Sequence, residues 1–305
     1  MLSEDVRAEL AAIDPRKRCD RLAELSGLFH TAGSLHLRGR GNVSLHLDLV
    51  SSGVARRAFL VLRKLAVDSE IHTYRRHAFG RETRYQLHVA GSSTARATLR
   101  EAGVLSQTGS PLARPPRRLV GKRCCRSAYL RGALLGAGSV SGPRSPHLEV
   151  RCASVDAAEF LAWATGLERV ELHVRDRARF ALAYAKGAET IAGALALAGA
   201  ADAALAIEEH AVLGSARAQA NRLANADHAN LVRASKAAHA QLEAIRELER
   251  TGALDELPQS LREMAELRLR YPALSLAELA RKCRPPASKA SAYRRLRRLI
   301  WLAAR

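Results

Sequence analysis

The sequence is poor in aromatic residues and holds no long apolar run. Only 4% of its 305 residues are Phe, Trp or Tyr, although 48% are hydrophobic, so aliphatic side chains must build its cores. No uninterrupted apolar stretch is long enough to cross a bilayer, and the charged, periodic N-terminus is unlike a signal peptide. These absences argue against a membrane protein. A length of 305 residues predicts two or three domains.

Cysteines are few and follow no ligand pattern. They are odd in number and lack Cys-x-x-Cys or Cys/His spacing: Cys19, Cys124, Cys125, Cys152 and Cys283. Disulfide scaffolds and zinc modules show regular cysteine spacings. We therefore expect reduced thiols, no structural zinc or other metal, and no cofactor.

Acidic residues are also scarce, since 49 Lys and Arg face 30 Asp and Glu and the net charge is +19. The excess is uneven. Residues 258–305 hold twelve Lys and Arg against three Asp and Glu, whereas residues 201–257 hold six against nine. A basic excess also occurs on membrane-binding proteins and on ordinary solvated faces. Its concentration on a small C-terminal module favours a polyanionic partner such as nucleic acid.

One helix-plus-turn motif occurs twice. Residues 25–35 read Leu-Ser-Gly-Leu-Phe-His-Thr-Ala-Gly-Ser-Leu, and residues 130–140 read Leu-Arg-Gly-Ala-Leu-Leu-Gly-Ala-Gly-Ser-Val. The offset of 105 residues is too long for a solenoid unit and fits a duplicated subdomain. Glycine inside a helix costs about 1 kcal/mol relative to alanine. Gly27 and Gly132 therefore predict two helices packed backbone to backbone across a pseudo-twofold axis.

Hydrophobic periodicity predicts the same order of elements around both copies. The first half is predicted as a helix at 3–12, the motif helix, strands at 35–37 and 43–49 around a loop at 38–42, a helix at 52–66, strands at 70–76 and 84–89, and a helix at 92–102. The second half is predicted as the motif helix at 122–137, strands near 140 and at 147–152, a helix at 154–165, strands at 169–175 and 179–185, and a helix at 187–198. A Gly/Pro/Ser-rich linker at 106–118 separates halves 1–105 and 119–198. The predicted fold class is α+β, with two αββαββα halves.

This order resembles the LAGLIDADG homing-endonuclease fold, in which two such halves form a saddle whose sheets ride on DNA. In the nucleases, an acid just before the final Gly of each motif helix holds the catalytic metal. The matching residues here are Ala32 and Ala137, whose methyl groups cannot replace carboxylate oxygens around Mg²⁺. His30 lies nearby, but a lone His at a helix end is more often structural. The resemblance implies the saddle without catalytic residues.

The predicted saddle face carries charges of both signs. Its side chains are His36, Arg38, His46, Arg84 and His88, together with Asp48, Glu149 and Glu171. Mixed charge is typical of the solvent side of a sheet. Whether the saddle contacts DNA stays open.

Residues 199–256 are predicted as a helical linker. Two stretches with helical spacing, 203–225 and 228–250, meet at Asn225-Ala226-Asp227. Asp227 can cap the N-terminus of the second helix, so we expect a break there.

The C-terminal residues 257–305 are predicted as a helix-turn-helix domain. Helical spacing covers 258–270, and the capping box formed by Ser275 and Glu278 opens a short helix. A last, basic helix covers 288–304. A basic solvated terminal helix is the alternative, but the capped short helix just before it favours a helix-turn-helix.

The outer face of the last helix supplies the predicted DNA-binding residues. They are Ser288, Lys289, Ser291, Arg294, Arg295, Arg297 and Arg298. The N-terminal part of such a helix enters the major groove, so Lys289, Ser291, Arg294 and Arg295 are predicted to reach base edges. Arg297 and Arg298 lie further along and are predicted to meet phosphates.

Both ends together resemble the WhiA family, transcription regulators of sporulation and cell division in Gram-positive bacteria. The resemblance covers essentially the whole chain, and its most specific stretches are 122–139, 221–225, 229–231, 257–268, 288–289 and 295–297. It implies a catalytically inactive LAGLIDADG-like domain at 1–198, the helical linker and a sigma-factor-like helix-turn-helix. Residues 290–294 read Ala-Ser-Ala-Tyr-Arg, where the family usually has Ser-Gly-Val-Asn-His. The operator sequence therefore cannot be carried over.

The sequence thus predicts a sequence-specific DNA-binding transcription regulator that is not an enzyme. Its partner is double-stranded DNA, with no membrane, and its location is the cytoplasmic nucleoid; a co-regulator protein or RNA polymerase stays open as a further partner. Two other functions remain: a LAGLIDADG-type DNA endonuclease, disfavoured by Ala32 and Ala137, and a scaffold whose saddle holds a protein.

Overall fold

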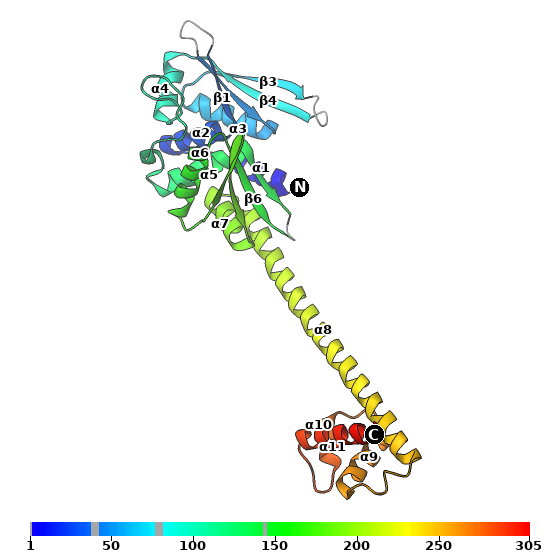
Figure 1. Ribbon diagram of the computed structural model, residues 1–305. Coiled ribbons are helices and arrows are strands. Elements are labelled where there is room, and N and C mark those ends of the chain that lie inside the picture. Colours follow the sequence, from blue (N-terminus) through cyan, green and yellow to red (C-terminus); the bar gives the residue numbers. More distant parts are fainter. Residues whose placement is uncertain (1, 38–42, 77–81, 143–144) are drawn as a thin grey trace. The chain divides into compact units, whose positions relative to one another are not determined.

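A computed structural model describes residues 2–37, 43–76, 82–142 and 145–305. The chain divides into two compact units, Met1–Ser215 and Ala216–Arg305. Figure 1 labels helices of both units and some strands of the first unit. Within the described residues, no helix is both long and apolar enough to cross a membrane.

The first unit repeats one order of elements. Its first half comprises α1 (Leu2–Ala12), α2 (Arg18–Ala32), β1 (Gly33–Leu37), β2 (Val43–Leu49), α3 (Ser52–Lys64), β3 (Ser69–Arg76), β4 (Glu82–Val89) and α4 (Ser93–Glu101). Its second half comprises the 3₁₀ helix η1 (Arg117–Val120), α5 (Arg123–Ala137), β5 (Gly138–Ser141), β6 (His147–Cys152), α6 (Val155–Gly166), β7 (His173–Arg177), β8 (Phe180–Lys186) and α7 (Ala188–Ala198). The predicted αββαββα duplication is confirmed. The loop expected at 38–42, with Arg38, lies outside the described residues.

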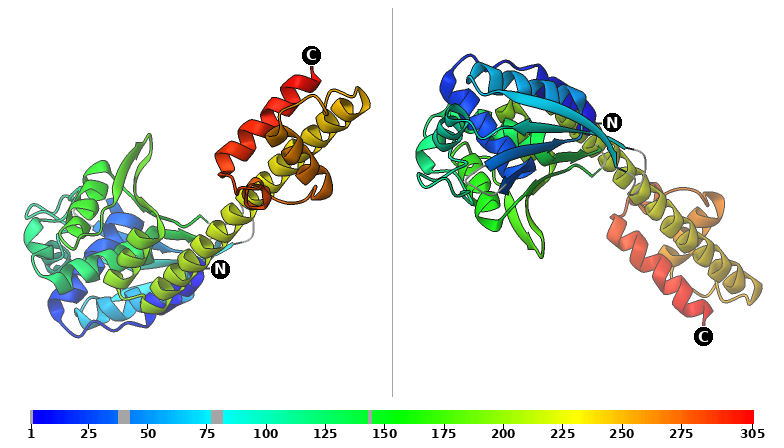
Figure 2. Two further views of the ribbon diagram at one scale, coloured as in Figure 1. Left: turned by 90° about the horizontal axis from the view of Figure 1, so that it is seen from below. Right: turned by 90° about the horizontal axis from the view of Figure 1, so that it is seen from above.

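The two sheets have the same antiparallel topology. The strand orders are β1-β2-β4-β3 and β5-β6-β8-β7. Alternate residues of β2, such as Leu45, Leu47 and Leu49, are buried, because one face of each sheet packs under helices. Figure 2 shows the helices of the first unit gathered on one side of the sheets. The other face of each sheet is left for a partner or for solvent.

The motif helices α2 and α5 form the seam between the halves. A Cβ atom added to Gly27 would overlap the Tyr129 carbonyl oxygen and lie 2.7 Å from the Ala133 nitrogen. A Cβ atom added to Gly132 would overlap the Glu24 carbonyl oxygen. The predicted backbone-to-backbone contact is confirmed, and it explains why each helix carries a glycine at that position.

A buried ion cluster also bridges this seam. The Glu24 carboxylate is fully buried and accepts hydrogen bonds from Arg57 Nε and Arg131 Nε, both at 2.8 Å. Arg131 Nη1 also donates to the Ala198 carbonyl oxygen at 3.2 Å, and Asp14 lies 3.5 Å from Arg57. Each of these charges has an opposite charge beside it, as burial requires. No local sequence pattern indicates this cluster, because Glu24 and Arg131 are 107 residues apart in the chain.

The linker between the two halves of the first unit is hydrogen-bonded to both halves. Leu105 is buried and pairs with Pro111, and the Leu112 amide donates to the Val104 carbonyl oxygen at 2.9 Å. Ser154 Oγ, from the second half, donates to the Ala113 carbonyl oxygen at 3.1 Å. These contacts hold the segment that joins the two halves.

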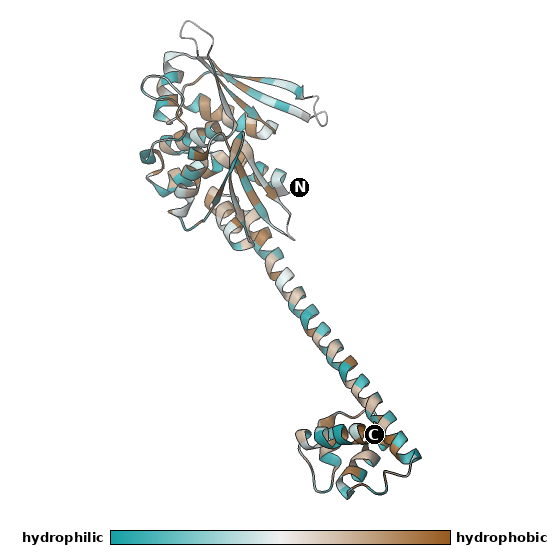
Figure 3. Ribbon diagram, in the orientation of Figure 1, coloured by the Kyte–Doolittle hydropathy of each residue, from teal (hydrophilic) through white to brown (hydrophobic). Residues whose placement is uncertain are grey.

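The helical linker differs from the expectation. It is one helix, α8 (Ala201–Arg250), with no break at Asn225-Ala226-Asp227. A break would leave up to four amides and four carbonyls without helical partners, whereas Asn and Asp inside a helix cost only several tenths of a kcal/mol each. Continuity is therefore favoured. Figure 3 shows hydrophilic and hydrophobic residues interspersed along α8.

The second unit has its own core. It contains α9 (Gln259–Arg270), α10 (Leu276–Lys282) and α11 (Lys289–Ala303). Ile245 and Leu248, from the end of α8, are buried in the cluster that holds Met264, Leu279 and Leu296. Ser275 and Glu278 form the predicted capping box, and Ser288 Oγ accepts from the Ser291 amide at 3.1 Å. The predicted capping box is confirmed, and Ser288 caps the start of α11.

Candidate nucleic-acid interface

Helices α10 and α11 meet in a short turn. The Ala287 amide donates to the Ala280 carbonyl oxygen at 2.9 Å, which ties the end of the turn back to α10. Ala292, Leu296 and Leu299 are fully buried against the core, so α11 has a single inward face. Because side chains on a helix repeat about every 3.6 residues, the positions between these buried residues lie on the outer face of α11.

The exposed face of α11 is basic. Lys289, Tyr293 and Arg297 follow one another at four-residue spacing, and Arg294 lies beside them; all four are exposed. Tyr293 is 50% exposed and was not among the predicted site residues. An exposed aromatic residue at helical spacing from the predicted Arg and Lys positions was the signal that could have identified it.

Arg295 lies on a different side of α11. Its Nη1 lies 3.7 Å from Glu263 Oε2 and 3.8 Å from Cys283 Sγ. Glu263 Oε1 also accepts from the Arg284 amide at 2.6 Å. Glu263 thus joins α9, the turn and α11, and it holds Arg295 against the domain.

Two further predicted residues, Ser288 and Arg298, have side-chain partners within the domain. Ser288 is occupied as the N-cap through the amide of Ser291. The Arg298 guanidinium lies 4.0 Å from the centre of the Trp301 ring, and Arg305 lies 3.8 Å from it. Such cation–π contacts hold an Arg side chain in place without neutralising its charge.

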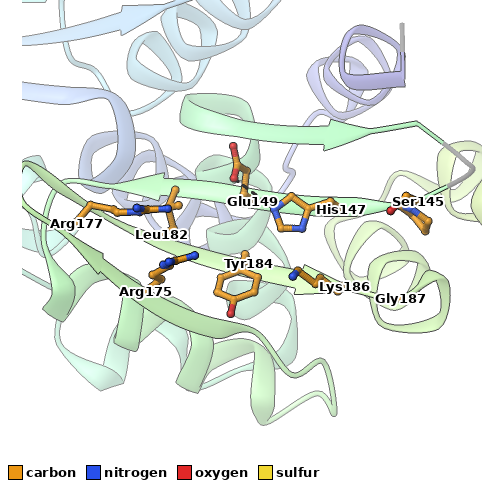
Figure 4. Close-up of a pocket in the computed structure, with 10 residues that line it drawn as sticks. Ser145, His147, Glu149, Arg175, Arg177, Leu182, Tyr184, Lys186 and Gly187 are labelled. Carbon is orange, nitrogen blue, oxygen red and sulfur yellow. Dashed lines mark ion pairs between the residues drawn. The ribbon is translucent and has the colours of Figure 1, made fainter.

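The open face of the second sheet carries a basic depression of about 500 Å³. Figure 4 shows Arg175 and Arg177 from β7 on one side of Tyr184, and Lys186 from β8 on the other. On β6, His147 Nε2 lies 3.4 Å from Glu149 Oε2. Three cationic side chains here face one carboxylate. The predicted saddle face did not include these Arg and Lys residues, because the residues it took from the second half were only the acids Glu149 and Glu171.

The expected strand at 169–175 begins four residues later than predicted. Arg169 has a positive φ of 63°, and β7 starts only at His173. Glu171 therefore precedes the strand and lines a different depression, beside Arg123 and Glu189. Contrary to the prediction, Glu171 does not lie on a strand of the saddle face.

The open face of the first sheet is rich in histidine. His36 stacks on His46 with ring centres 4.3 Å apart, and His46 meets His88 edge-on at 4.8 Å. Asp48 accepts from the Tyr74 hydroxyl at 2.9 Å. Arg84 lies on β4, paired in register with Tyr74. This face is less basic than that of the second sheet.

The ends of the motif helices carry alanine, as the sequence indicates. Ala32 is the last residue of α2 and Ala137 the last of α5. His30 is buried; its Nδ1 lies 2.8 Å from the Ser26 carbonyl oxygen, and burial lowers its pKa because it disfavours the charged ring. Within the described part of the chain, clusters of three or more metal-ligating side chains lie elsewhere: at Cys19, Asp20, Cys124 and Cys125, and at Glu70, His72 and His88.

Comparison with known proteins decides the family. The sequence matches the WhiA N-terminal LAGLIDADG-like domain at residues 18–105, the WhiA LAGLIDADG-like domain at 126–217 and the WhiA C-terminal HTH domain at 220–303. The chain belongs to the WhiA family. It is 37% identical over 302 residues to the probable cell division protein WhiA of Symbiobacterium thermophilum, covering 98% of this chain and 96% of the relative. The WhiA of Heliobacterium modesticaldum is 36% identical, covering 99% and 95%.

A solved WhiA structure has the same fold. The full-length WhiA from Thermatoga maritima matches with a TM-score of 0.59 and 21% sequence identity, covering 99% of this chain and 97% of that one. The resemblance to the WhiA family and the predicted saddle with a helix-turn-helix are thereby confirmed.

Proposed function

We propose that this WhiA-family chain is a sequence-specific DNA-binding transcription regulator of cell division or sporulation, that it acts on the cytoplasmic nucleoid, and that it has no nuclease activity. The basic outer face of α11, carried on a capped helix-turn-helix, is the observation that supports it most directly. The relatives' name, cell division protein, supports the biological role.

In this proposal the N-terminal half of α11 enters the major groove. Lys289, Tyr293 and Arg294 then face the base edges, because they lie on the exposed side of the first turns. Arg297 and Arg298, further along, contact phosphates, which adds affinity without sequence preference. Arg295 acts as a positioning residue through its contact with Glu263.

The depression on the second sheet supplies a further phosphate contact. Arg175, Arg177 and Lys186 line one depression on the open face of the second sheet. In the LAGLIDADG saddle that the chain resembles, the sheets ride on DNA. In a test, Arg175→Ala combined with Arg177→Ala lowers affinity for specific and random duplexes equally. Unchanged affinity at low salt would restrict DNA binding to the helix-turn-helix.

The absence of nuclease activity rests on Ala32 and Ala137. A divalent metal that cleaves phosphodiesters needs carboxylates or equivalent oxygens to hold it. Both helix ends carry methyl groups at these positions, and the nearby His30 is buried and bonded to its own helix.

Selection from random duplex pools with the full chain tests the regulator hypothesis. We expect one enriched motif and tighter binding of that duplex than of a scrambled one. The triple variant Lys289→Ala, Arg294→Ala and Arg297→Ala should lose the preference. A matched control removes the same residue types from the exposed surface of α8: Arg217→Ala, Arg222→Ala and Lys236→Ala. Selection without an enriched motif would contradict sequence-specific binding.

A further inference from the structure

The duplication repeats a second, shorter motif at the start of each motif helix. Residues 17–20 read Lys-Arg-Cys-Asp and residues 122–125 read Lys-Arg-Cys-Cys, again 105 residues apart. The two stretches begin α2 and α5. Because these helices pack together along a pseudo-twofold seam, the duplication brings four side chains with metal-ligating atoms to one place.

The spacing of the four donor atoms is that of a small coordination shell. The Sγ atoms of Cys19, Cys124 and Cys125 and a carboxylate oxygen of Asp20 all lie within 4.8 Å of one another. The Cys124 and Cys125 sulfurs are 3.9 Å apart, and Asp20 Oδ1 lies 3.4 Å from the Cys19 sulfur and 3.8 Å from the Cys125 sulfur. In tetrahedral zinc coordination, the bond lengths place two sulfurs about 3.8 Å apart and a sulfur and an oxygen about 3.5 Å apart.

We propose that Cys19, Asp20, Cys124 and Cys125 bind one Zn²⁺ ion and so staple the N-terminal ends of α2 and α5. Four protein ligands leave no open position, so the site is structural. It is also remote from Ala32 and Ala137: at 1.5 Å per residue, the helix starts lie roughly 18 Å from the helix ends.

In the metal-free chain, contact with Asp20 raises the pKa of the Cys124 thiol and burial raises the pKa of Cys125 to about 12, so the positive charge of a bound metal is needed to deprotonate both thiols. Helix N-termini carry partial positive charge and stabilise anions, and two such termini meet here. Arg18 and Arg123 do not compete for Asp20, because they pair with Glu101 at 2.5 Å and Glu168 at 3.3 Å. The metal charge, the two helix ends and the flanking lysines together offset the three thiolates and the carboxylate.

The donor set selects the metal. Thiolates prefer zinc over magnesium or calcium, which take oxygen ligands. Three sulfurs and one oxygen within 4.8 Å of one another match the ligand set of a single zinc ion. The other cluster, Glu70, His72 and His88, lies largely exposed on the open face of the first sheet, and it provides a comparison site for the experiment.

The test uses the full chain purified without chelators and without metal-affinity resin. We expect one zinc per chain by mass spectrometry of the digested protein, released when a mercurial reagent modifies the thiols. In cobalt-exchanged protein we expect the strong visible absorption of tetrahedral Co²⁺ with thiolate charge-transfer bands. Cys124→Ser should lower zinc affinity by more than the roughly 10- to 100-fold caused by changes next to a ligand.

Two variants separate ligation from folding. Asp20→Cys completes a four-cysteine site and should retain one zinc per chain with higher affinity. Cys152→Ala removes a thiol from β6, outside the cluster, and should leave zinc unchanged.

Three results would overturn the proposal. The first is protein with no stoichiometric zinc and no tetrahedral cobalt spectrum. The second is zinc that survives Cys124→Ser but is lost in His72→Ala combined with His88→Ala, which would place the metal on the first sheet. The third is a disulfide between these cysteines in freshly isolated, metal-free protein.

Discussion

Glu24 and Arg131 are 107 residues apart in the chain, and their side chains meet at 2.8 Å inside the seam between the two halves. Glu24 is fully buried and Arg131 nearly so. Arg57 binds the other oxygen of the same carboxylate, so one acid from α2 holds an arginine from α3 and an arginine from the second half. The two halves of the duplication are joined by charge as well as by close glycine packing.

Removal of this carboxylate should strongly destabilise the folded chain. Glu24→Ala leaves two buried guanidinium groups without their shared partner, and we expect the free energy of unfolding to fall by about 3–5 kcal/mol. The control is Glu101→Ala, which breaks the exposed pair with Arg18 and should cost at most about 1 kcal/mol. Denaturant unfolding of both variants measures the difference. Equal, small losses would mean that the cluster adds no stability.

The glycine seam should tolerate no side chain. Gly27→Leu or Gly132→Leu forces a side chain into the backbone of the opposite helix, and we expect a loss of about 1–3 kcal/mol or more. Gly214→Ala on α8 is the control, because nothing lies within 4 Å of its added Cβ and alanine is the better helix former. Thermal melts compare the three. A Gly27 variant that melts like the parent would contradict the seam.

The DNA contacts should divide into two kinds. Arg294→Ala should reduce the difference in affinity between the selected and random duplexes by about 1–3 kcal/mol, as expected for loss of a bidentate base contact. Arg298→Ala should weaken both about equally and reduce the salt slope by about one unit. Binding isotherms at several salt concentrations separate the two. If Arg294→Ala leaves the preference intact, α11 does not read sequence through that residue.

The chain should leave DNA uncut. Supercoiled and linear DNA incubated with the protein and Mg²⁺ or Mn²⁺ should remain intact, because Ala32 and Ala137 provide no oxygen ligand. Gel electrophoresis of the DNA, with a chelator as control, is the measurement. Chelator-sensitive cleavage by clean protein would restore the endonuclease hypothesis.

Stability should depend on pH through His30. Burial lowers the pKa of this histidine in the folded chain below its ordinary value of 6.5. The unfolded chain therefore binds the proton first as pH falls, so stability is complete above about pH 6.5 and declines below it, toward the lower pKa of the folded state. His30→Gln should remove part of this decline, whereas His210→Gln on the exposed surface of α8 should not. Unfolding free energies between pH 7 and 5 test the difference.

Local patterns in the sequence were enough for most elements and for the helix-turn-helix, although not for the continuity of α8 or the start of β7. Alternating Leu45, Leu47 and Leu49 indicated a half-buried strand, and the capping box of Ser275 and Glu278 indicated the start of a short helix. Both signals act over a few residues, since periodicity and caps depend on neighbours along the chain. The site residues could be predicted as a face of α11, but the inward contact of Arg295 with Glu263 could not.

By itself, the sequence determined the duplicated fold, the glycine seam, the alanines at the ends of the motif helices and the basic last helix. Only the tertiary structure decided which distant side chains meet: Glu24 with Arg131, and Cys19 with Cys124 and Cys125. The cysteines look scattered because ligand motifs are read as short spacings, whereas this group is assembled by two helix starts 105 residues apart. Packing of α2 against α5 brings these cysteines together. Interactions between residues that are close in the sequence cannot determine how near they come.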